Sequence, residues 1–593
     1  MEKEQKNQGF LFRDRDKVSL PKGTPLAEYP RPQLKRDSYL SLNGFWDLAI
    51  TKSEEIPSDY PLQVNVPFAV ESALSSVNHL LEKDEYLYYR KMVALPSGFR
   101  KERILLHFDG VDQTSEVYIN RHLVKRHNSG YTPFDIELPF GVGDKFELIV
   151  KVRDETDSSY HSRGKQVLKP FWYNYTSSSG IYKPVWVESM PRNYIQSVRF
   201  TPLFDQHLVK VRITTKEKTF ATIRIGKILY RIDTNAESTL SVIDFHPWTV
   251  EDPYLYPVHI KTESDAVDSY FGMRMIEIQE ENGFKHIYLN HKPIFLSGLL
   301  DQGYYFISNL TPRSYRDYQD DILAAKKMGF NCLRVHIKTE CEYFYYLADS
   351  LGMLLIQDFP CGGEHYSFFR VGIPRLLNFM NQEKHINYRN MGRLNEEGRK
   401  EFEEEAKTYL SLFYNHPSIV IYTIFNEGWG EFDPSRIYHE LKEIDPTRLY
   451  DTASGWYDAD SDFYSIHTYT FPKMKRKNKE KRAFVISEMG GCSYKVPDHS
   501  YFEGFFGHHK AKDAKDLSQQ VTKLYLRDIL PQIQQYGLNM TIYTELADCE
   551  TEYNGLITYD RKVTKMDPVR MKHLNDKLYQ TFAEQFRKNP AKP

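Results

Sequence analysis

From about residue 278 onward, short apolar segments alternate with segments of helical periodicity, and this alternation constrains the fold more than any other feature. Tyr318, Ile322 and Ala325 fall on one helical face after Pro312, and an apolar segment follows this helix. The third and sixth connections are long and irregular. Eight strand–helix units over about 300 residues predict a C-terminal (β/α)8 TIM barrel, residues 278–593. Its strand candidates are 294–299, 332–337, 353–359, 419–425, 449–453, 463–467, 483–487 and 540–545.

The first half of the chain lacks helical periods and consists of short segments in which polar and apolar residues alternate. Turns rich in Gly, Asp and Asn separate these segments, as at Asp109-Gly110. Closely spaced strands of this kind predict a β jelly roll for residues 1–190 and an immunoglobulin-like β-sandwich for residues 191–277. Three domains also agree with a length of 593 residues, which is too long for one ordinary domain.

Composition excludes several classes of partner. The net charge is −2 and no run of about 18 apolar residues occurs, so neither nucleic acid nor a membrane is an expected partner. The basic run 473–482 is interpreted as a solvated loop. The five cysteines have no metal-ligand spacing, and the N-terminal residues lack the apolar core of a secretory signal. We therefore expect a cytoplasmic protein with free thiols and with neither a cofactor nor a metal ion.

Two glutamates stand at the ends of predicted barrel strands. Strand four ends in Asn426 and Glu427, and strand seven ends in Glu488. In a TIM barrel the functional side chains lie at the C-terminal ends of the strands. A carboxylate directly after buried apolar residues is costly unless something compensates for its desolvation. Each glutamate alone reads as a solvated strand end, but the pair, with Asn before one and Gly-Gly soon after the other, favours a catalytic acid and a nucleophile.

The residues around both glutamates resemble the catalytic signatures of glycoside hydrolase family 2. These segments are FNEGWG (425–430) and SEMGG (487–491). The resemblance extends along the chain in the right order and implies a sugar-binding domain ahead of a catalytic barrel, in a branch named after β-galactosidase and β-glucuronidase. Further segments that carry it are YPRPQLKRDSYLSLNGFWD (29–47), FDGVDQTSEVYIN (108–120), SGIYKPVWVE (179–188) and GFNCLRVH (329–336).

For this sequence, the resemblance implies that Glu427 is the general acid/base and Glu488 the nucleophile, while Asn426 hydrogen-bonds the sugar 2-hydroxyl. The expected reaction is hydrolysis of a terminal β-linked sugar by double displacement, with retention of configuration. One carboxyl must then be protonated and the other ionised, and the two must lie about 5 Å apart. A separation of about 7–9 Å would instead indicate an inverting enzyme.

Further candidates for contact with the substrate lie near the strand ends. Arg334 has two interpretations, because it aligns with the family's barrel arginine and would also suit a buried structural ion pair. His467 is equally a structural histidine or a pocket residue, whereas Trp429 suits stacking on the aglycone, the leaving group of the substrate. The full set is Arg334, His467, Tyr469, Trp429, Tyr494, Lys495, Asp301 and Glu545, with Gln302 beside Asp301.

Departures from the family pattern surround the expected sugar site. Strand two reads RVHIK (334–338) where relatives have Arg followed shortly by His-Tyr, and strand eight ends TELAD without the usual Trp. The Asn-x-Lys signature with which β-glucuronidases hold the sugar carboxylate is absent after strand eight. Asn575 and Lys577 repeat it in the last helix, where we expect a surface position. Lys338 or Lys495 could still receive a uronic acid, since a lysine offers a point charge for its carboxylate.

The leading hypothesis is an exo-acting β-galactosidase on a small glycoside or oligosaccharide, with the N-terminal sandwich closing the pocket. A β-uronidase or another β-glycosidase of the family is the first alternative. A carbohydrate-binding protein without catalysis is the alternative from another class. A metal hydrolase lacks support, because no HExxH segment or Cys/His cluster occurs. Homo-oligomers are common among large enzymes of this kind, but no residue identifies an interface.

Overall fold

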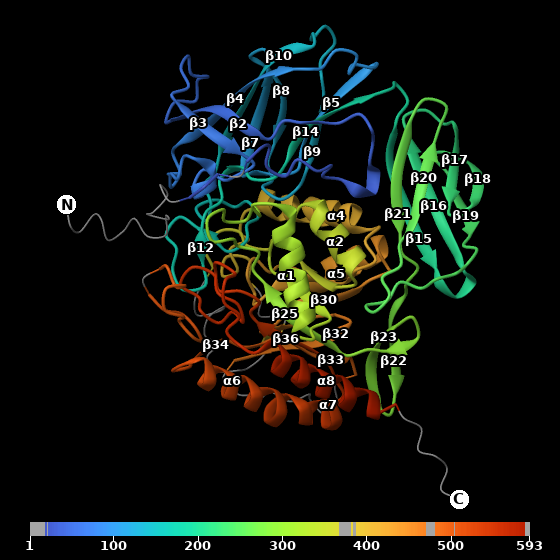
Figure 1. Cartoon of the computed structure of the whole chain (residues 1–593), viewed down its shortest axis with the longest axis vertical. Coiled ribbons are helices and arrows are strands. Elements are labelled where there is room, and N and C mark those ends of the chain that lie inside the picture. Colours follow the sequence, from blue (N-terminus) through green and yellow to red (C-terminus); the bar gives the residue numbers. More distant parts are fainter. Residues whose placement is uncertain are drawn as a thin grey trace, which may run out of the picture.

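The first domain is an all-β sandwich, which lies at the top of the computed structural model in Figure 1. The structure describes residues 18–20, 22–366, 381–382, 387–469, 481–502 and 504–586. Polar and apolar residues alternate along the strands, so each sheet turns one face into a shared core. The all-β character predicted for this part is confirmed. Its strands are β3 (Leu62–Val66), β2 (Gly44–Thr51), β4 (Tyr86–Ala94), β10 (Lys145–Arg153), β7 (Thr114–Ile119) and β8 (His122–His127) in one antiparallel sheet, and β1 (Leu40–Ser41), β14 (Val185–Met190), β5 (Arg103–Phe108) and β9 (Phe134–Glu137) in the other.

A second, smaller sandwich follows and lies on the right in Figure 1. Val209, Ile223 and Ile260 are fully buried in its core. Its designation as immunoglobulin-like and its limits of 191–277 stay predictions. One sheet contains β15 (Ile195–Leu203), β16 (Leu208–Thr215) and β19 (Glu237–Ser241), and the other contains β18 (Ile228–Asp233), β17 (Phe220–Ile225), β20 (Tyr256–Lys261) and β21 (Ala266–Phe271).

Eight parallel strands form the predicted TIM barrel, and each contains most of one segment predicted from the sequence. Among the described strands, backbone ladders join all neighbours except β30 and β32, so the barrel is nearly closed. Between those two strands the Ser465 hydroxyl donates to Asp451 at 2.7 Å. In chain order the strands are β25 (Leu296–Asp301), β26 (Cys332–Val335), β27 (Leu354–Asp358), β29 (Ile419–Asn426), β30 (Leu449–Ser454), β32 (Phe463–Thr468), β33 (Ala483–Gly490) and β36 (Leu538–Thr544).

The third connection contains helix α4 (Glu396–Phe413), so the prediction of an irregular segment is wrong there. The side chain of Asn395 accepts a hydrogen bond from the Gly398 N–H and thereby starts the helix, whose residues Phe402 and Tyr409 are fully buried. The sixth connection, with the basic run 473–482, lies mostly outside the described residues. The other barrel helices are α1 (Tyr315–Lys327), α2 (Glu342–Leu351), α5 (Pro434–Ile444), α6 (Ala514–Lys523), α7 (Leu530–Tyr536) and α8 (Pro568–Glu584).

Asn575 on α8 is buried, which corrects the surface position expected for it. Its side chain accepts a hydrogen bond from the Ser297 hydroxyl at 2.7 Å and donates to the Met328 carbonyl at 2.9 Å. It therefore anchors the last helix to the barrel. Within the described part of the chain, no helix combines the length and the apolar character that a membrane span requires.

A hairpin of β22 (Ile276–Glu281) and β23 (Phe284–Leu289) covers the amino ends of the barrel strands. Asn539 near the start of β36 donates to the Lys285 carbonyl at 2.9 Å and accepts from the Ile287 N–H at 3.2 Å. The carboxyl ends of the strands instead face the first domain, as the 2.9 Å hydrogen bond from Lys183 to Thr339 shows. This end is where a TIM barrel carries its functional residues.

Asp349 joins the second sandwich to the barrel, and its removal tests that junction. Its carboxylate accepts from the Tyr270 hydroxyl at 2.8 Å and the Ser418 N–H at 3.0 Å, and it lies 2.6 Å from His416 Nδ1; all four residues are buried. Asp349→Ala leaves these groups unmatched, at about 1–3 kcal/mol for each. We expect the urea midpoint of unfolding, followed by circular dichroism, to fall. Asp320→Ala removes an exposed carboxylate from α1 and should leave the midpoint unchanged; an equal fall in both variants would contradict the role of Asp349.

Candidate active site

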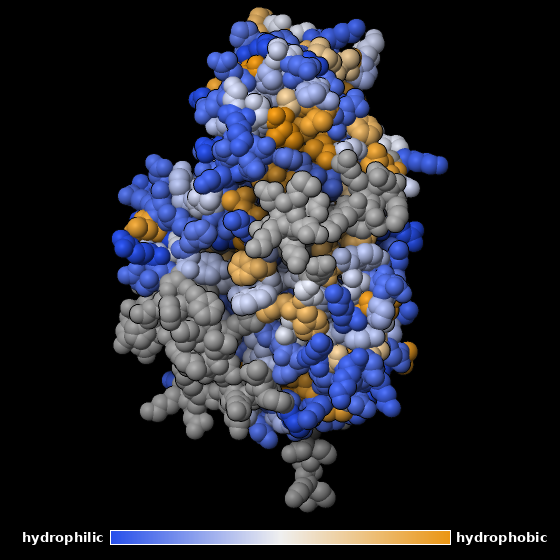
Figure 2. Space-filling view, turned by 90° about the vertical axis from the view of Figure 1, so that its left-hand side faces the viewer, coloured by the Kyte–Doolittle hydropathy of each residue, from blue (hydrophilic) through white to orange (hydrophobic). Residues whose placement is uncertain are grey.

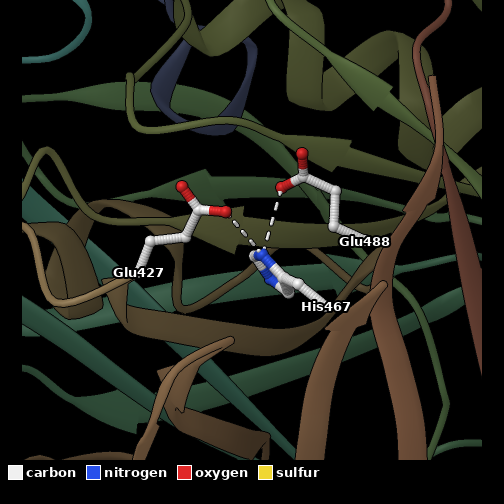
Figure 3. A group of neighbouring side chains, drawn as sticks. All are labelled: Glu427, His467 and Glu488. Carbon is white, nitrogen blue, oxygen red and sulfur yellow. Dashed lines mark hydrogen bonds and ion pairs between the residues drawn. The ribbon is translucent and has the colours of Figure 1, made fainter. Parts of the chain in front are cut away.

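Glu427 and Glu488 approach each other at the carboxyl end of the barrel (Figure 3). Glu427 directly follows β29, and Glu488 lies near the end of β33. One carboxylate oxygen of each residue and one ring nitrogen of His467 all lie within 4.8 Å of one another. Both glutamates are more than nine-tenths buried, so water screens their charges poorly. The fold thus brings together the two strand-end carboxylates that the sequence singles out.

Tyr469 and His467 link the two carboxylates. The Tyr469 hydroxyl lies 2.6 Å from Glu488 Oε1 and 3.1 Å from Glu427 Oε1. His467 Nδ1 lies 2.9 Å from Glu427 Oε1 and 3.8 Å from Glu488 Oε2, as Figure 3 shows. A phenol has one proton, so it can donate to one carboxyl and must accept from the other. The arrangement therefore suits a pair in which one glutamate is protonated and the other ionised.

Arg334 is fully buried and ties together residues from four strands. Its Nε donates to both oxygens of Asp358, at 2.9 and 3.0 Å. Its two terminal nitrogens donate to the Ser487 carbonyl at 2.9 Å and to Asn426 Oδ1 at 2.8 Å, and Nη1 lies 3.8 Å from Glu488 Oε2. Burial alone would lower the pKa of Arg334, but Asp358 and Glu488 raise it above its ordinary value. Arg334 is therefore both a structural ion-pair partner and a cation beside Glu488.

A tight turn carries Glu427 out of the end of its strand. Glu427 has a left-handed backbone with φ 54°, and its N–H donates to the Ser454 carbonyl at 2.8 Å. Such a conformation in a residue other than glycine persists only where neighbouring contacts determine it. A Cβ at Gly430 would come within 1.8 Å of the Cys361 carbonyl oxygen. The FNEGWG segment is therefore required by close packing as well as by the position of its glutamate.

Trp429 lies at the mouth of the barrel, between two tyrosine rings. Its ring stacks on Tyr173 at 6.0 Å and on Tyr366 at 5.7 Å between centroids. Tyr173 belongs to a loop of the first domain, between β11 (Gln166–Val167) and β12 (Tyr175–Thr176). The wall of the site beside Glu427 is therefore built by two domains.

Asp301 and Glu545 lie at the ends of the neighbouring strands β25 and β36. Asp301 pairs with Lys338 Nζ at 3.4 Å, and Lys338 also contacts Glu340. Burial, followed by the charge of Glu552, raises the pKa of Glu545 well above its ordinary value. The carboxylates of Asp301 and Glu340 therefore already neutralise the charge of Lys338.

Tyr494 and Lys495 lie in the loop after β33. The Tyr494 carbonyl accepts a hydrogen bond from Lys565 Nζ at 3.0 Å. Lys495 is exposed, and its Nζ donates to the Phe502 carbonyl at 2.9 Å. Among the described residues, no hydrogen bond or ion pair joins Tyr494 or Lys495 to Glu488.

Three polar residues of the site were missed by sequence reasoning. Asp358 ends β27 as a carboxylate after apolar residues, so the criterion applied to the glutamates would have found it. His336 Nδ1 lies 2.8 Å from Asp358, and burial together with the charge of Lys165 lowers the pKa of His336 to about 4. Lys165 comes from the first domain and is only 8% exposed. Within the described chain its side chain has no hydrogen bond or ion pair, and its Nζ lies 5.5 Å from the Tyr175 ring centre. No sequence signal marks Lys165, because its segment has no regular period.

The same arrangement could also be considered for a metal ion. In the described part of the chain, one group has ligand atoms spaced closely enough to hold a metal ion; it consists of Glu427, His467 and Glu488. Their contacts are already accounted for without an ion, because the Tyr469 hydroxyl bridges the two carboxylates and His467 lies at hydrogen-bond distance from Glu427. We therefore interpret the group as a site for proton transfer and nucleophilic attack.

Comparison with known proteins relates both the N-terminal domain and the barrel to one family. Residues 34–191 match the model "Glycosyl hydrolases family 2, sugar binding domain", and residues 278–491 match "Glycosyl hydrolases family 2, TIM barrel domain". A β-glucuronidase of Streptococcus agalactiae is 25% identical over 462 residues, which cover 71% of this chain and 72% of that enzyme. A β-galactosidase of Thermoanaerobacter pseudethanolicus is 24% identical over 503 residues, which cover 78% of this chain and 60% of that enzyme.

Solved structures resemble the chain along most of its length. The β-glucuronidase of Ruminococcus gnavus in complex with uronic isofagomine superimposes with a TM-score of 0.72 at 18% identity, covering 93% of this chain and 99% of that one. The β-galacturonidase of Eisenbergiella tayi bound to galacturonate gives a TM-score of 0.66 at 18% identity, covering 94% and 99%. At this identity the likeness concerns the fold. Together with the matched family models, it shows that the chain belongs to glycosyl hydrolase family 2.

Proposed function

We propose that the protein is a retaining exo-β-glycosidase, in which Glu488 is the nucleophile and Glu427 the general acid/base. The observation that carries the proposal is the spacing of the two carboxylates, whose nearest oxygens lie within 4.8 Å. Retaining enzymes hold their carboxyl groups about 5–5.5 Å apart, whereas inverting enzymes leave about 6.5–9.5 Å for a water molecule. This spacing lies below the inverting range and supports direct attack by one carboxylate on the anomeric carbon.

The surroundings of Glu488 suit a nucleophile. The Arg334 guanidinium lies 3.8 Å from its Oε2 and favours the ionised form. Oε2 itself has no hydrogen bond among the described residues, while Oε1 accepts one from Tyr469 at 2.6 Å. One oxygen is therefore positioned by the tyrosine and the other has a lone pair available for attack.

The surroundings of Glu427 suit an acid/base. Its Oε1 faces His467 and Tyr469, both of which are linked to the rest of the site by hydrogen bonds. As Glu488 bonds to the anomeric carbon, the glycosidic bond breaks and Glu427 gives its proton to the departing oxygen. The Glu427 carboxylate that remains then takes a proton from the water that displaces Glu488 from the sugar. Asn426 precedes Glu427, and because Arg334 holds its Oδ1, its Nδ2 is the group left to donate to a sugar hydroxyl.

The first domain supports exo action, and the engaged lysines support a neutral sugar. Tyr173 and Lys165 of that domain close one side of the barrel mouth, as a pocket for a terminal residue requires. Lys338 is paired with Asp301 and Glu340, and Lys495 points to a carbonyl at the surface, so neither is free to hold a uronic acid. We propose a β-galactoside as the substrate.

A β-uronide is the second candidate, and Lys165 is the observation that favours it. This lysine is nine-tenths buried, has no ion pair in the described chain, and is close enough to His336 to lower the pKa of that histidine. Its charge acts on the buried carboxylate of Glu545, but no carboxylate of the described chain forms an ion pair with it. A buried cation without a close ion pair is costly, and a substrate carboxylate would stabilise it. A β-uronide would therefore bind through Lys165, whereas a β-galactoside would not need its charge.

Glutamine variants test the proposed mechanism. We expect Glu488→Gln to lower kcat on a nitrophenyl β-glycoside by on the order of 10⁴-fold, because no nucleophile remains. We expect Glu427→Gln to lower it by about 10²–10⁴-fold and to remove the alkaline limb of the pH profile, which reports loss of the acid's proton. The matched control Glu440→Gln changes an exposed glutamate on α5 and should retain full activity.

Unchanged turnover in both active-site variants would refute the mechanism and favour a carbohydrate-binding protein. Activity should also resist EDTA. Loss of activity with EDTA, restored by a divalent ion, would instead support metal binding by Glu427, His467 and Glu488.

A panel of nitrophenyl glycosides combined with Lys165→Met tests the sugar. We expect turnover of the β-galactoside by the wild type and by the variant alike, since a neutral sugar needs no cation. If the wild type instead cleaves only a β-glucuronide or β-galacturonide, and Lys165→Met loses about 100-fold in kcat/KM on it, the galactoside proposal is wrong and the uronide is the substrate. Lys169→Met changes an exposed lysine four residues further along the chain and is the matched control.

A further inference from the structure

Two large aromatic side chains are exposed on the loop of the first domain that reaches the barrel. Phe171 is 51% exposed and Trp172 is 55% exposed. The loop is nevertheless held in place: the backbone of Phe171 pairs with that of Asn174 in both directions, and the Thr551 hydroxyl donates to the Trp172 carbonyl at 3.0 Å. Figure 2 looks onto the side on which β12 lies in Figure 1, and hydrophobic patches interrupt the polar surface along the middle of this face.

One series of ring contacts connects Trp172 to the acid/base. Trp172 stacks on Phe506 at 6.2 Å, Phe506 meets Tyr173 edge-on at 5.2 Å, and Tyr173 stacks on Trp429 at 6.0 Å. Trp429 is separated from Glu427 by a single residue. The exposed tryptophan is therefore continuous, ring by ring, with the wall of the proposed active site.

A second series of contacts reaches the same place from the nucleophile. The Tyr469 hydroxyl contacts both catalytic carboxylates, and the Tyr469 ring lies parallel to the His508 ring at 3.8 Å. His508 meets Phe506 edge-on at 5.6 Å. Both series thus converge on Phe506, directly beneath Trp172. We refer to Trp172, Tyr173, Phe506 and His508 as the aromatic lane.

The lane lies where the leaving group of a bound glycoside must go. When the anomeric carbon is at Glu488 and the glycosidic oxygen at Glu427, the aglycone extends away from the strands toward the barrel mouth. Flat aromatic groups stack on aromatic rings in offset or edge-on geometry. A second sugar would need several hydrogen-bonding partners as well, but the neighbouring Thr551 hydroxyl is used to hold the loop. The lane offers mainly ring faces, and its polar atoms are confined to the ring edges of Trp172, Tyr173 and His508.

We propose that the aromatic lane is an aglycone subsite and that the natural leaving group is a flat aromatic alcohol. This inference rests on the proposed glycosidase function and adds the class of aglycone to it. Trp172 supplies the outermost ring of the subsite. It does not take part in bond cleavage, so its contribution is confined to substrates with an aromatic leaving group.

The test compares glycosides that share one sugar, the one identified by the nitrophenyl panel, and differ in the leaving group. The aromatic substrates carry 4-nitrophenyl and 2-naphthyl groups, and the others carry a methyl group or a second sugar. We expect Trp172→Ala to lower kcat/KM about 3- to 10-fold on the aromatic substrates and to leave the other two unchanged. Trp172→Phe, which keeps a ring, should lose less. Phe140→Ala, an exposed phenylalanine elsewhere in the first domain, is the matched control.

Three outcomes would overturn the proposal: no loss on the aromatic substrates, an equal loss on all four, or a loss confined to the disaccharide. The last would indicate a sugar as leaving group. If the wild type cleaves no glycoside at all, the proposed function fails, and the subsite is tested by binding of a 2-naphthyl 1-thio-β-glycoside instead. Weaker binding to Trp172→Ala than to wild type would then retain the subsite, and equal binding would refute it.

Discussion

The carboxyl end of the barrel depends on one buried cation, the guanidinium of Arg334. Desolvating such a group costs several kcal/mol, and the cost is offset here by two hydrogen bonds from Nε to the Asp358 carboxylate. The remaining donors reach Asn426 and the Ser487 carbonyl, which are the residues directly before Glu427 and Glu488. A single planar group therefore sets the positions of both strand ends. The two glutamates are thus positioned from the barrel strands themselves.

The candidate site contains residues of the first domain as well as residues of the barrel. Backbone hydrogen bonds in both directions between Arg163 and Gly362 attach the long loop of the first domain to the segment after β27. Further along the loop, Lys165 lies close enough to His336 for its charge to lower the pKa of that histidine. The ring of Tyr173, on the same segment, stacks on Trp429. In the proposed function the strands carry the catalytic glutamates, and the loop carries the groups that distinguish the two candidate sugars and the leaving group.

Local sequence was sufficient to predict the barrel and its paired glutamates. Buried parallel strands are continuous apolar runs, and a charged residue at the end of such a run stands out. Asp358 satisfies the same rule at the end of β27, but it lies outside the two segments that resemble the catalytic signatures. Lys165 could not be predicted, since it meets the site only through contacts between residues far apart in the chain. Asn575 was placed at the surface because helical position alone does not reveal which face packs against the barrel.

The opposite roles proposed for Glu427 and Glu488 require that their surroundings differ, and here the difference comes from the elements that flank them. Glu488 lies beside the permanent charge of Arg334, which stabilises a carboxylate in the resting state. Glu427 lies beside His467 and Tyr469, which have protons to give or accept. The tyrosine hydroxyl contacts both, so loss of the Glu488 charge in a covalent intermediate would be transmitted to Glu427 through one shared proton. In the proposed double displacement, a shift of these hydrogen bonds would accompany the change of Glu427 from acid to base.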